Sequence, residues 1–392
     1  MNVLRSLLAI AAVLCSLASA TSARAADPPF EFNVLVPVTG GGAFLGKSYE
    51  EALAGLEIAI NSSGGIQGRP IKFVISDSQT SGQVGLQIVN GLIAKHVALF
   101  VDGGPSPVCN SSIPLLEKSG PLDYCLSPLI TPAPRSYVFS SSASANDLAA
   151  VAIRFLRNKG LKRLAVIQIT DSTGQAYERA VAVAMLRREN AGVALVASEH
   201  FNAADISVAA QLTRIAAAKP DALMIWATGS PLGTVLHGLK DGGYTFPVVT
   251  SNSNMTYAQM ASYQSVLPKV FYFPSLRSLL PKQTLKGPLR DAQTVWVNSF
   301  AKLKIRPDSG HSLMWDSVMV FVDALRHAGP SATSEQLRDY ILAQHSWVGT
   351  NGVYDFASGD QRGLGDGAIV MARWDAGKGT WVQVSAPKGA LQ

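Results

Sequence analysis

A glycine-rich loop near the start of the chain is the first segment whose residues could do chemistry. Residues 40–46, GGGAFLG, follow a predicted apolar strand, and Asp77 follows the next predicted strand. A loop and an acidic residue in these places are what a dinucleotide-binding G-x-G-x-x-G motif would show. After Gly40 and Gly42, however, the motif requires glycine at position 45, which is Leu45. The spacing therefore argues against a nucleotide cofactor.

The sequence also lacks the residue patterns of catalytic and metal sites. The histidines are too far apart in sequence to suggest a metal-ligand spacing. No G-x-S-x-G nucleophile motif occurs. We therefore expect a protein that is not an enzyme and that uses neither a metal nor a cofactor. The six histidines are His96, His200, His237, His311, His327 and His345.

The glycine loop lies in a strand–loop–helix–strand unit, from the strand over 34–38 to the strand over 71–75. Such a unit places the loop at the carboxyl end of a parallel strand, where open α/β sheets bind ligands. Strands and helices keep alternating along the chain, which predicts an α/β fold of parallel sheets covered on both faces. Further strands are predicted over 98–101, 122–126, 163–169, 194–198, 222–226, 247–250 and 270–273, and helices over 83–95, 111–119, 147–158, 176–189, 207–218, 231–241, 289–303, 311–327 and 334–343.

Several short motifs resemble those of periplasmic solute-binding proteins of the branched-chain amino acid (Leu/Ile/Val-binding) type. The first strand ends in P-x-T-G at 37–40, and the first helix ends in G-G-I-x-G-R-P at 64–70. The resemblance covers nearly the whole chain and implies the type I, or Venus flytrap, fold, in which two doubly wound lobes are joined by three crossovers. It assigns residues 31–144 and 276–350 to lobe 1, and residues 145–275 and 351–392 to lobe 2. About 365 residues after the leader are enough for two such lobes.

The resemblance also indicates a site for a carboxylate in lobe 1. In the family, a serine hydroxyl, a backbone N–H and a threonine hydroxyl bind the substrate carboxylate, and these positions correspond to Ser106, Leu129 and Thr131. Neutral donors at strand ends and helix starts can hold an anion without a buried positive charge. The alternative for each residue is that it only shapes a proline-rich turn.

Other positions that resemble ligand contacts are Phe44 and Leu45 in the glycine loop, and Thr173, Gly229 and Asn252 in lobe 2. Phe44 and Leu45 alternatively pack under their own loop. Ser48 and Glu51 lie three residues apart, which is the spacing of a helix-capping box, so we also predict a structural cap there.

The class of ligand is inferred from the absence of a carboxylate that could pair with an α-ammonium group. No Asp or Glu occurs from 242 to 290, where amino-acid binders carry the carboxylate that pairs with the α-ammonium. An ammonium without that partner is costly to bury. The sequence therefore favours a carboxylate without an α-ammonium, aromatic or aliphatic, over a branched-chain amino acid, although Asp171 offers another partner for an ammonium.

The first 25 residues predict a signal peptide. Arg5 precedes an apolar run of about 11 residues, too short for a membrane span of about 20. We expect cleavage near Ala25; lipidation at Cys15 is less favoured because Leu14 is large. The leader holds two of the 33 basic and none of the 27 acidic residues, so the net charge falls from +6 to +4. These charges are scattered, which argues against nucleic-acid binding.

Cys109 and Cys125 remain after the leader is removed. In an exported protein such a pair predicts a disulfide, the alternative being two buried free thiols. We expect a monomeric periplasmic protein without a membrane span that delivers a small carboxylate or amino acid to the permease of an ABC importer. The alternative is an exported sensor of the same fold that signals to a membrane receptor.

Overall fold

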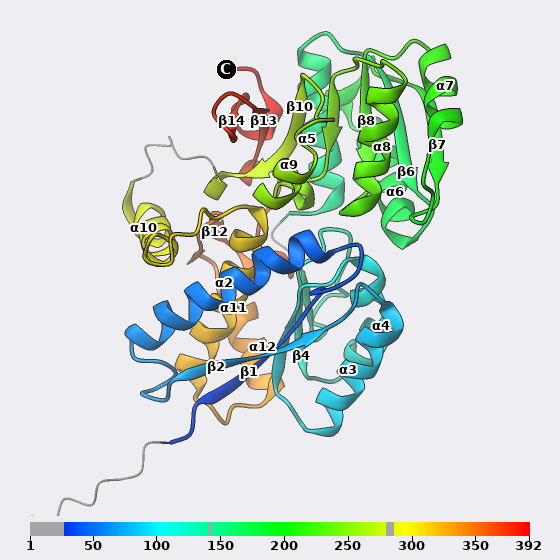
Figure 1. Ribbon diagram of the computed structural model, residues 1–392. Coiled ribbons are helices and arrows are strands. Elements are labelled where there is room, and N and C mark those ends of the chain that lie inside the picture. The colour runs from blue at the N-terminus through cyan, green and yellow to red at the C-terminus, as the bar shows by residue number, and fades with distance from the viewer. Residues whose placement is uncertain (1–26, 141–142, 280–285) are drawn as a thin grey trace, which may run out of the picture.

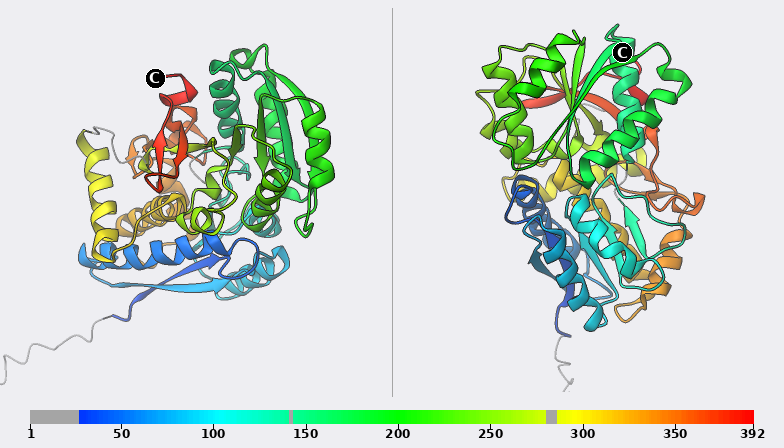
Figure 2. Two further views of the ribbon diagram at one scale, coloured as in Figure 1. Left: turned by 45° about the horizontal axis from the view of Figure 1, so that its top comes forward. Right: turned by 90° about the vertical axis from the view of Figure 1, so that its right-hand side faces the viewer.

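The computed structural model describes residues 27–140, 143–279 and 286–392, which form two lobes, one above the other in Figure 1. The predicted signal peptide and Cys15 lie outside the described residues. Each lobe contains one large sheet with helices on both faces, as the turned views in Figure 2 show. A short two-stranded sheet, β11 (Trp347–Val348) with β12 (Val353–Tyr354), is separate from both.

The sheet of lobe 1 is parallel throughout, in the order β2-β1-β3-β4-β5. One face packs on α2 and α11, where Phe32 and Tyr124 meet Phe321. The other face packs on α3 and α4, where Phe100 and Cys109 share a core. The strands are β1 (Phe30–Val36), β2 (Ile71–Asp77), β3 (Leu99–Asp102), β4 (Leu122–Cys125) and β5 (Val138–Ser140), and the helices are α2 (Ala43–Ser62), α3 (Gly82–Ala94), α4 (Ser106–Leu116), α10 (Gly287–Lys302), α11 (Ser309–Ala328) and α12 (Ser334–Leu342).

The sheet of lobe 2 has the order β14-β13-β10-β9-β8-β6-β7. Its strands β6 to β10 are parallel, and β13 and β14 add an antiparallel hairpin. The strands are β6 (Arg163–Ile169), β7 (Ala194–Phe201), β8 (Ala222–Trp226), β9 (Val248–Thr250), β10 (Phe271–Leu276), β13 (Ile369–Asp375) and β14 (Thr380–Gln383), and the helices are α5 (Ala145–Asn158), α6 (Ser172–Leu186), α7 (Ala209–Ala217), α8 (Ser230–Asp241) and α9 (Tyr257–Ser262).

The parallel parts of the two sheets have the same topology, because β7-β6-β8-β9-β10 repeats the order of lobe 1. The chain passes between the sheets after β5, after β10 and after β12. The predicted fold of two doubly wound lobes joined by three crossovers is therefore confirmed, whereas the exact lobe boundaries stay a prediction. In the part of the chain described, no helix is long and apolar enough to cross a membrane.

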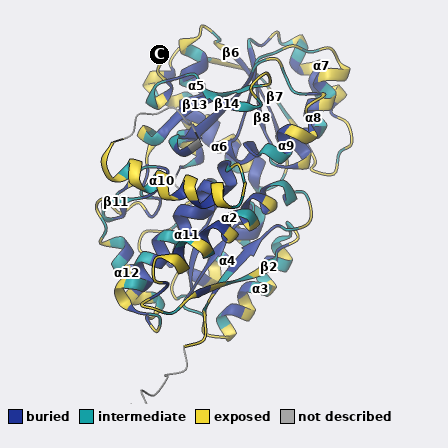
Figure 3. Ribbon diagram, turned by 60° about the vertical axis from the view of Figure 1, so that its left-hand side comes forward, coloured by how far each residue is buried: buried dark blue, intermediate teal, exposed yellow. Residues whose placement is uncertain are grey.

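Burial follows the sequence pattern of a parallel sheet. The strand β8 reads ALMIW and is buried along its whole length, because helices cover both faces. Figure 3 shows the buried strands inside each lobe and exposed residues along the outer faces of α3, α7 and α10. Continuous apolar runs in the sequence therefore predicted central strands of the sheet correctly.

Several helices begin earlier than the sequence predicts, and one predicted cap is wrong. The helix α2 begins at Ala43, inside the predicted glycine loop, so Ser48 lies within the helix and does not cap it. The Ser48 hydroxyl instead donates to Asp308 Oδ2 at 3.0 Å. The helix α4 begins at Ser106 and not near 111, because proline is tolerated in the first helical turn, where its missing N–H costs nothing.

Candidate ligand-binding site

A cavity of about 440 Å³ lies between the two lobes. Its walls come from the loops after β1, β2 and β3 in lobe 1 and after β6, β7 and β8 in lobe 2. In each sheet these loops flank the point where the strand order reverses, which is where doubly wound folds bind ligands. The lining residues are Gly41, Gly42, Gln79, Thr80, Pro105, Pro107, Ile169, Asp171, Thr173, Ala203, Ala204, Thr228, Ser230 and Pro231.

The lobes touch each other beside this cavity. The Ser230 N–H donates to the Gly41 carbonyl at 3.2 Å, across the two lobes. Gly229, at the start of α8, has φ +76°, and an added Cβ would lie 2.0 Å from the Gly41 oxygen. The Gly229 N–H donates to Asn254 Oδ1 at 3.1 Å, which holds this turn in place. Gly229 therefore permits the close approach of the lobes.

A second contact between the lobes lies at the start of α11. Asp308 Oδ2 accepts hydrogen bonds from the Ser48 hydroxyl and, at 3.2 Å, from the backbone N–H of Tyr257 in lobe 2. Asp308 Oδ1 lies 2.9 Å from His311 Nδ1, and Glu51 lies 3.3 Å from His311 Nε2. Burial alone would lower the pKa of His311, but Asp308 and Glu51 raise it to about 9. This charged cluster joins the lobes away from the cavity.

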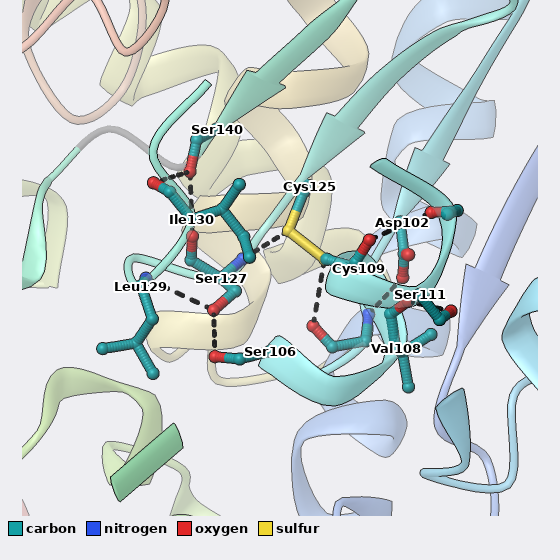
Figure 4. The surroundings of a disulfide bond; sticks show 12 residues. Asp102, Ser106, Val108, Cys109, Ser111, Cys125, Ser127, Leu129, Ile130 and Ser140 are labelled. Carbon is teal, nitrogen blue, oxygen red and sulfur yellow. Dashed lines mark hydrogen bonds between the residues drawn. A yellow bond between two sulfur atoms is a disulfide. The ribbon is translucent and has the colours of Figure 1, made fainter. Parts of the chain in front are cut away.

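The predicted carboxylate site of lobe 1 is a compact group of neutral donors (Figure 4). The hydroxyl oxygens of Ser106 and Ser127 lie 2.9 Å apart, and the Leu129 N–H donates to Ser127 Oγ at 3.3 Å. Ser106 is the first residue of α4, where free N–H groups and the helix dipole favour an anion. Ser106 lies between Pro105 and Pro107, which line the cavity. The structure therefore brings Ser106 and Leu129 together.

The disulfide between Cys109 and Cys125 forms as predicted, with a Cα–Cα distance of 6.1 Å. Cys109 lies in the first turns of α4, and Cys125 ends β4, two residues before Ser127. The bridge thus holds the segment that carries Ser106 to the segment that carries Ser127 (Figure 4). Ser127 was not among the predicted ligand contacts, although its place directly after a strand was a usable signal.

The remaining candidates of lobe 1 are dispersed. Thr131 is exposed, and Leu129 is half-buried. Leu45 packs in the core of lobe 1. Phe44 lies against lobe 2, with its ring centroid 5.8 Å from that of Tyr263. Phe44, Leu45, Leu129 and Thr131 are not among the lining residues of the cavity, and their role in ligand binding stays a prediction.

Lobe 2 contributes polar groups without a positive charge. Thr173 lines the cavity, and its backbone N–H donates to Asp171 Oδ1 at 2.8 Å. Asn252 is buried, and within the described part of the chain its Oδ1 has no hydrogen-bond partner. Asn254 is different, since its amide group bonds to the Ala227 carbonyl and the Thr250 hydroxyl. Of the two asparagines, Asn252 is the one with an acceptor left for a ligand.

An aromatic pair that the sequence did not reveal lies behind the lobe 2 wall. Tyr177 of α6 and Trp226 at the end of β8 are stacked with centroids 4.4 Å apart. Both side chains are fully buried, and burial raises the pKa of Tyr177 to about 12. Trp226 Nε1 has no hydrogen-bond partner among the described residues. This pair stiffens the end of β8, next to the loop that lines the cavity.

No described residues gather three or more His, Cys, Asp or Glu side chains that could hold a metal ion. Asp77, the acid that imitates a nucleotide-binding residue, is engaged with the loop after β1. Its carboxylate accepts the Thr39 hydroxyl at 2.7 Å and the Gln79 N–H at 2.8 Å. Burial pushes the pKa of Asp77 up, but the hydrogen bonds to its carboxylate together outweigh burial and hold the pKa below its ordinary value.

The model of the periplasmic binding protein family matches residues 31–379 of the sequence. The chain belongs to this family. It is therefore a solute-binding protein and not an enzyme, and its family is extracytoplasmic. No curated protein matches the chain in sequence.

Solved structures of other binding proteins share the fold of this one. An extracellular ligand-binding receptor from Rhodopseudomonas palustris is 19% identical, with a TM-score of 0.78 over 91% of this chain and 99% of the other. A fatty acid ABC transporter substrate-binding protein from Thermomonospora curvata is 18% identical, with a TM-score of 0.76 over 92% of each chain. The leucine-binding protein LivK from Thermotoga maritima is 18% identical, with a TM-score of 0.76 over 90% of this chain and 97% of the other.

Proposed function

We propose that this binding protein is the substrate-capturing component of an ABC importer and that it holds a small carboxylate between its lobes. The observation that carries the proposal is the cavity of about 440 Å³ at the two facing strand-order reversals. That volume suits a small molecule. Neighbours in fold that are named as ABC transporter components, such as the Thermomonospora curvata protein, favour transport over signalling.

The carboxylate is held at the lobe 1 side. Ser106 at the start of α4, together with Ser127 and the Leu129 N–H in the loop after β4, supplies the donors. Each charge-assisted hydrogen bond of this kind contributes about 1.5–3 kcal/mol. The hydroxyls of Ser106 and Ser127 now bond to each other, and both can turn their protons toward a ligand. This group is the anion-binding end of the proposed site.

The other end of the ligand meets lobe 2. Among the described residues that line the cavity, Asp171 alone is charged, and its Oδ1 accepts the N–H groups of Thr173 and Gly174. Because the carboxylate of Asp171 already caps α6, it is a weak partner for an ammonium. We therefore favour an aromatic or aliphatic carboxylate over a branched-chain amino acid. The unpaired Oδ1 of Asn252 would accept a hydroxyl or N–H group of such a ligand.

The test is a thermal-shift screen followed by calorimetry on matched pairs of an amino acid and its deaminated analogue. Suitable pairs are leucine with 4-methylpentanoate and phenylalanine with 3-phenylpropanoate. We expect the deaminated member to bind at least as tightly as the amino acid. A tenfold preference for the amino acid, about 1.4 kcal/mol, would overturn the ligand class. If no carboxylate raises the melting temperature, the carboxylate-binding function itself is wrong.

The proposal also covers export, oligomeric state and delivery of the ligand. We propose export to the periplasm with cleavage near Ala25, a monomeric state, and delivery of the ligand to a membrane permease. Mass spectrometry of the exported protein checks the cleavage site. Light scattering with and without ligand checks the monomeric state.

A further inference from the structure

A buried arginine connects two of the three passages between the lobes. Arg362 follows β12, in the third passage, and its side chain is only 5% exposed. Its Nη1 donates to Ser140 Oγ at 3.0 Å. Ser140 ends β5, directly before the first passage. A guanidinium in this position touches both connections around which the lobes would move.

The segment that carries Arg362 is fixed along β5. The Ser140 N–H donates to the Gln361 carbonyl at 3.4 Å. The Gln361 amide nitrogen donates to the carbonyls of Ser136, at 3.2 Å, and of Val138. The third passage is therefore paired with the edge strand of lobe 1, and the position of Arg362 is set by lobe 1.

Ser140 continues this connection toward the predicted carboxylate site (Figure 4). Its hydroxyl donates to the Ser127 carbonyl at 2.8 Å, and its oxygen lies 3.5 Å from the Ile130 carbonyl. Ser127 Oγ in turn meets Ser106 Oγ and the Leu129 N–H. Two hydrogen bonds thus separate the Arg362 guanidinium from the backbone of the loop that presents the donors.

We propose that Arg362 is a positioning residue for carboxylate binding: it holds the 127–130 loop through Ser140 and places a positive charge behind the neutral donors. The inference rests on the proposed function, since it assumes that the ligand carboxylate meets Ser106, Ser127 and the Leu129 N–H. Arg362 does not touch the ligand. Its charge acts through protein of low dielectric constant, where it is weakly screened.

The state of the guanidinium supports this role. Burial lowers the pKa of Arg362 to about 10, while the carboxylates of Asp360 and Asp147 act in the opposite direction. The group therefore keeps its charge at neutral pH. The buried positive charge of Arg362 therefore makes the electrostatic potential at the neutral donors more favourable for an anion. These donors are Ser106, Ser127 and the Leu129 N–H.

The test uses acetate and its uncharged analogue acetamide as probes of the full-length mature protein. Acetate dissociation constants are measured by calorimetry for the unsubstituted protein, Arg362→Met, Arg362→Lys and Ser140→Ala. We expect Arg362→Met to weaken acetate about tenfold and acetamide much less, which corresponds to about 1.4 kcal/mol of charge-dependent binding. Arg362→Lys should recover most of the loss, because lysine restores the charge without the planar fork.

Two controls separate the possible failures. Arg326→Met removes a half-buried arginine elsewhere in lobe 1, which bonds to Ser63 and the Gly65 carbonyl at the end of α2, and should leave acetate binding unchanged. Equal acetate affinity in Arg362→Met and the unsubstituted protein would overturn the inference but not the proposed function. Equal losses for acetate and acetamide would also overturn it. If the unsubstituted protein binds neither acetate nor any carboxylate of the screen, the carboxylate site fails and both proposals fall. If it binds a carboxylate of the screen but not acetate, that carboxylate and its amide replace acetate and acetamide as the probes. Should Arg362→Met not fold, Ser140→Ala decides, with an expected loss of about threefold.

Discussion

The two lobes repeat one strand order but present different groups to the cavity between them. Lobe 1 lines the cavity with neutral residues such as Gln79 and Thr80. Next to Pro105 and Pro107 it carries the donor group of Ser106, Ser127 and the Leu129 N–H. Lobe 2 offers Thr173 and, behind the cavity, an unpaired acceptor on Asn252. The same topology therefore supports two tasks. The donors of lobe 1 suit an anion, and the mixed groups of lobe 2 suit the variable part of a ligand.

The lobes also differ in how their cavity edges are held. In lobe 1 a disulfide joins α4 to β4 next to the donors. In lobe 2 the comparable turn is held by two hydrogen bonds: the Gly229 N–H donates to Asn254 Oδ1, and the Gln259 amide donates to the Gly229 carbonyl. The cavity edge of lobe 1 is thus held by a covalent bond, whereas that of lobe 2 is held by hydrogen bonds alone, which break and re-form more easily. The predictions below test this contrast, from the largest expected effect to the smallest.

Gly229→Ala should have the largest effect on binding. A Cβ at this position would lie 2.0 Å from the Gly41 carbonyl, so the lobes could not close. We expect the dissociation constant of the ligand found in the screen to rise by about 100-fold or more, about 2.7 kcal/mol. Calorimetry measures the change.

Gly160→Ala is the matched control for strain. Gly160 has a similar φ of +82°, but no atom lies within 4 Å of an added Cβ. Both variants should lose about 1 kcal/mol of stability from the positive φ. Only Gly229→Ala should lose affinity. Equal affinities in the two variants would show that closure at Gly41 is not needed.

Removing the disulfide should destabilise lobe 1. The bridge links residues 16 apart in sequence. Chain entropy predicts a loss of about 3 kcal/mol in the free energy of unfolding for Cys109→Ala with Cys125→Ala. Denaturant unfolding of the oxidised, reduced and double-alanine proteins measures it. Reducing agent should leave the double-alanine protein unchanged; a loss seen there would point to another cause.

Ser106→Ala should weaken carboxylate binding by about ten- to hundredfold while the fold is kept. Sequence alone predicts a similar loss for Thr131→Val. Because the Thr131 side chain is exposed, we now expect less than about threefold for that variant. Calorimetry on both variants decides the matter. If Thr131→Val loses more affinity than Ser106→Ala, the ligand carboxylate binds near Thr131 and not at Ser106.

Much of the fold was readable from the sequence because central strands of parallel sheets are continuous apolar runs. The strands over Arg163–Ile169 and Ala222–Trp226 coincide with their predicted ranges. The start of α4 was missed because Pro105 and Pro107 were interpreted as a turn, although proline also fits a first helical turn.

The site was less predictable because it depends on distant contacts. Ser106 and Leu129 were predicted from the resemblance to the binding-protein family, in segments that follow two strands. No local signal links Ser48 to Asp308 or Arg362 to Ser140, pairs that lie 260 and 222 residues apart in sequence. The local sequence pattern thus predicts which loops face the cavity. Which side chains contact each other depends on how distant segments pack together.

The smallest expected effect concerns pH and again separates the lobes. Lobe 1 buries Asp102 and Asp123 on adjacent strands, whereas no Asp or Glu is buried in the described strands of the lobe 2 sheet. Burial raises the pKa of Asp102 from 3.8 to about 7, and burial together with the Asp102 charge raises that of Asp123. The folded lobe 1 therefore holds more protons than the unfolded chain between these values.

It follows that lobe 1 has its full stability below about pH 4 and loses part of it as the pH rises from there through about 7. Hydrogen exchange, corrected for the intrinsic rate at each pH, reports the lobes separately. Amides of β3 and β4 should exchange faster at pH 8 than at pH 5, and those of β6 and β8 should change less. Asp123→Asn should flatten the difference, since the amide does not ionise. If both lobes respond equally to pH, the buried pair is not its source, and the contrast between the lobes does not extend to their stability.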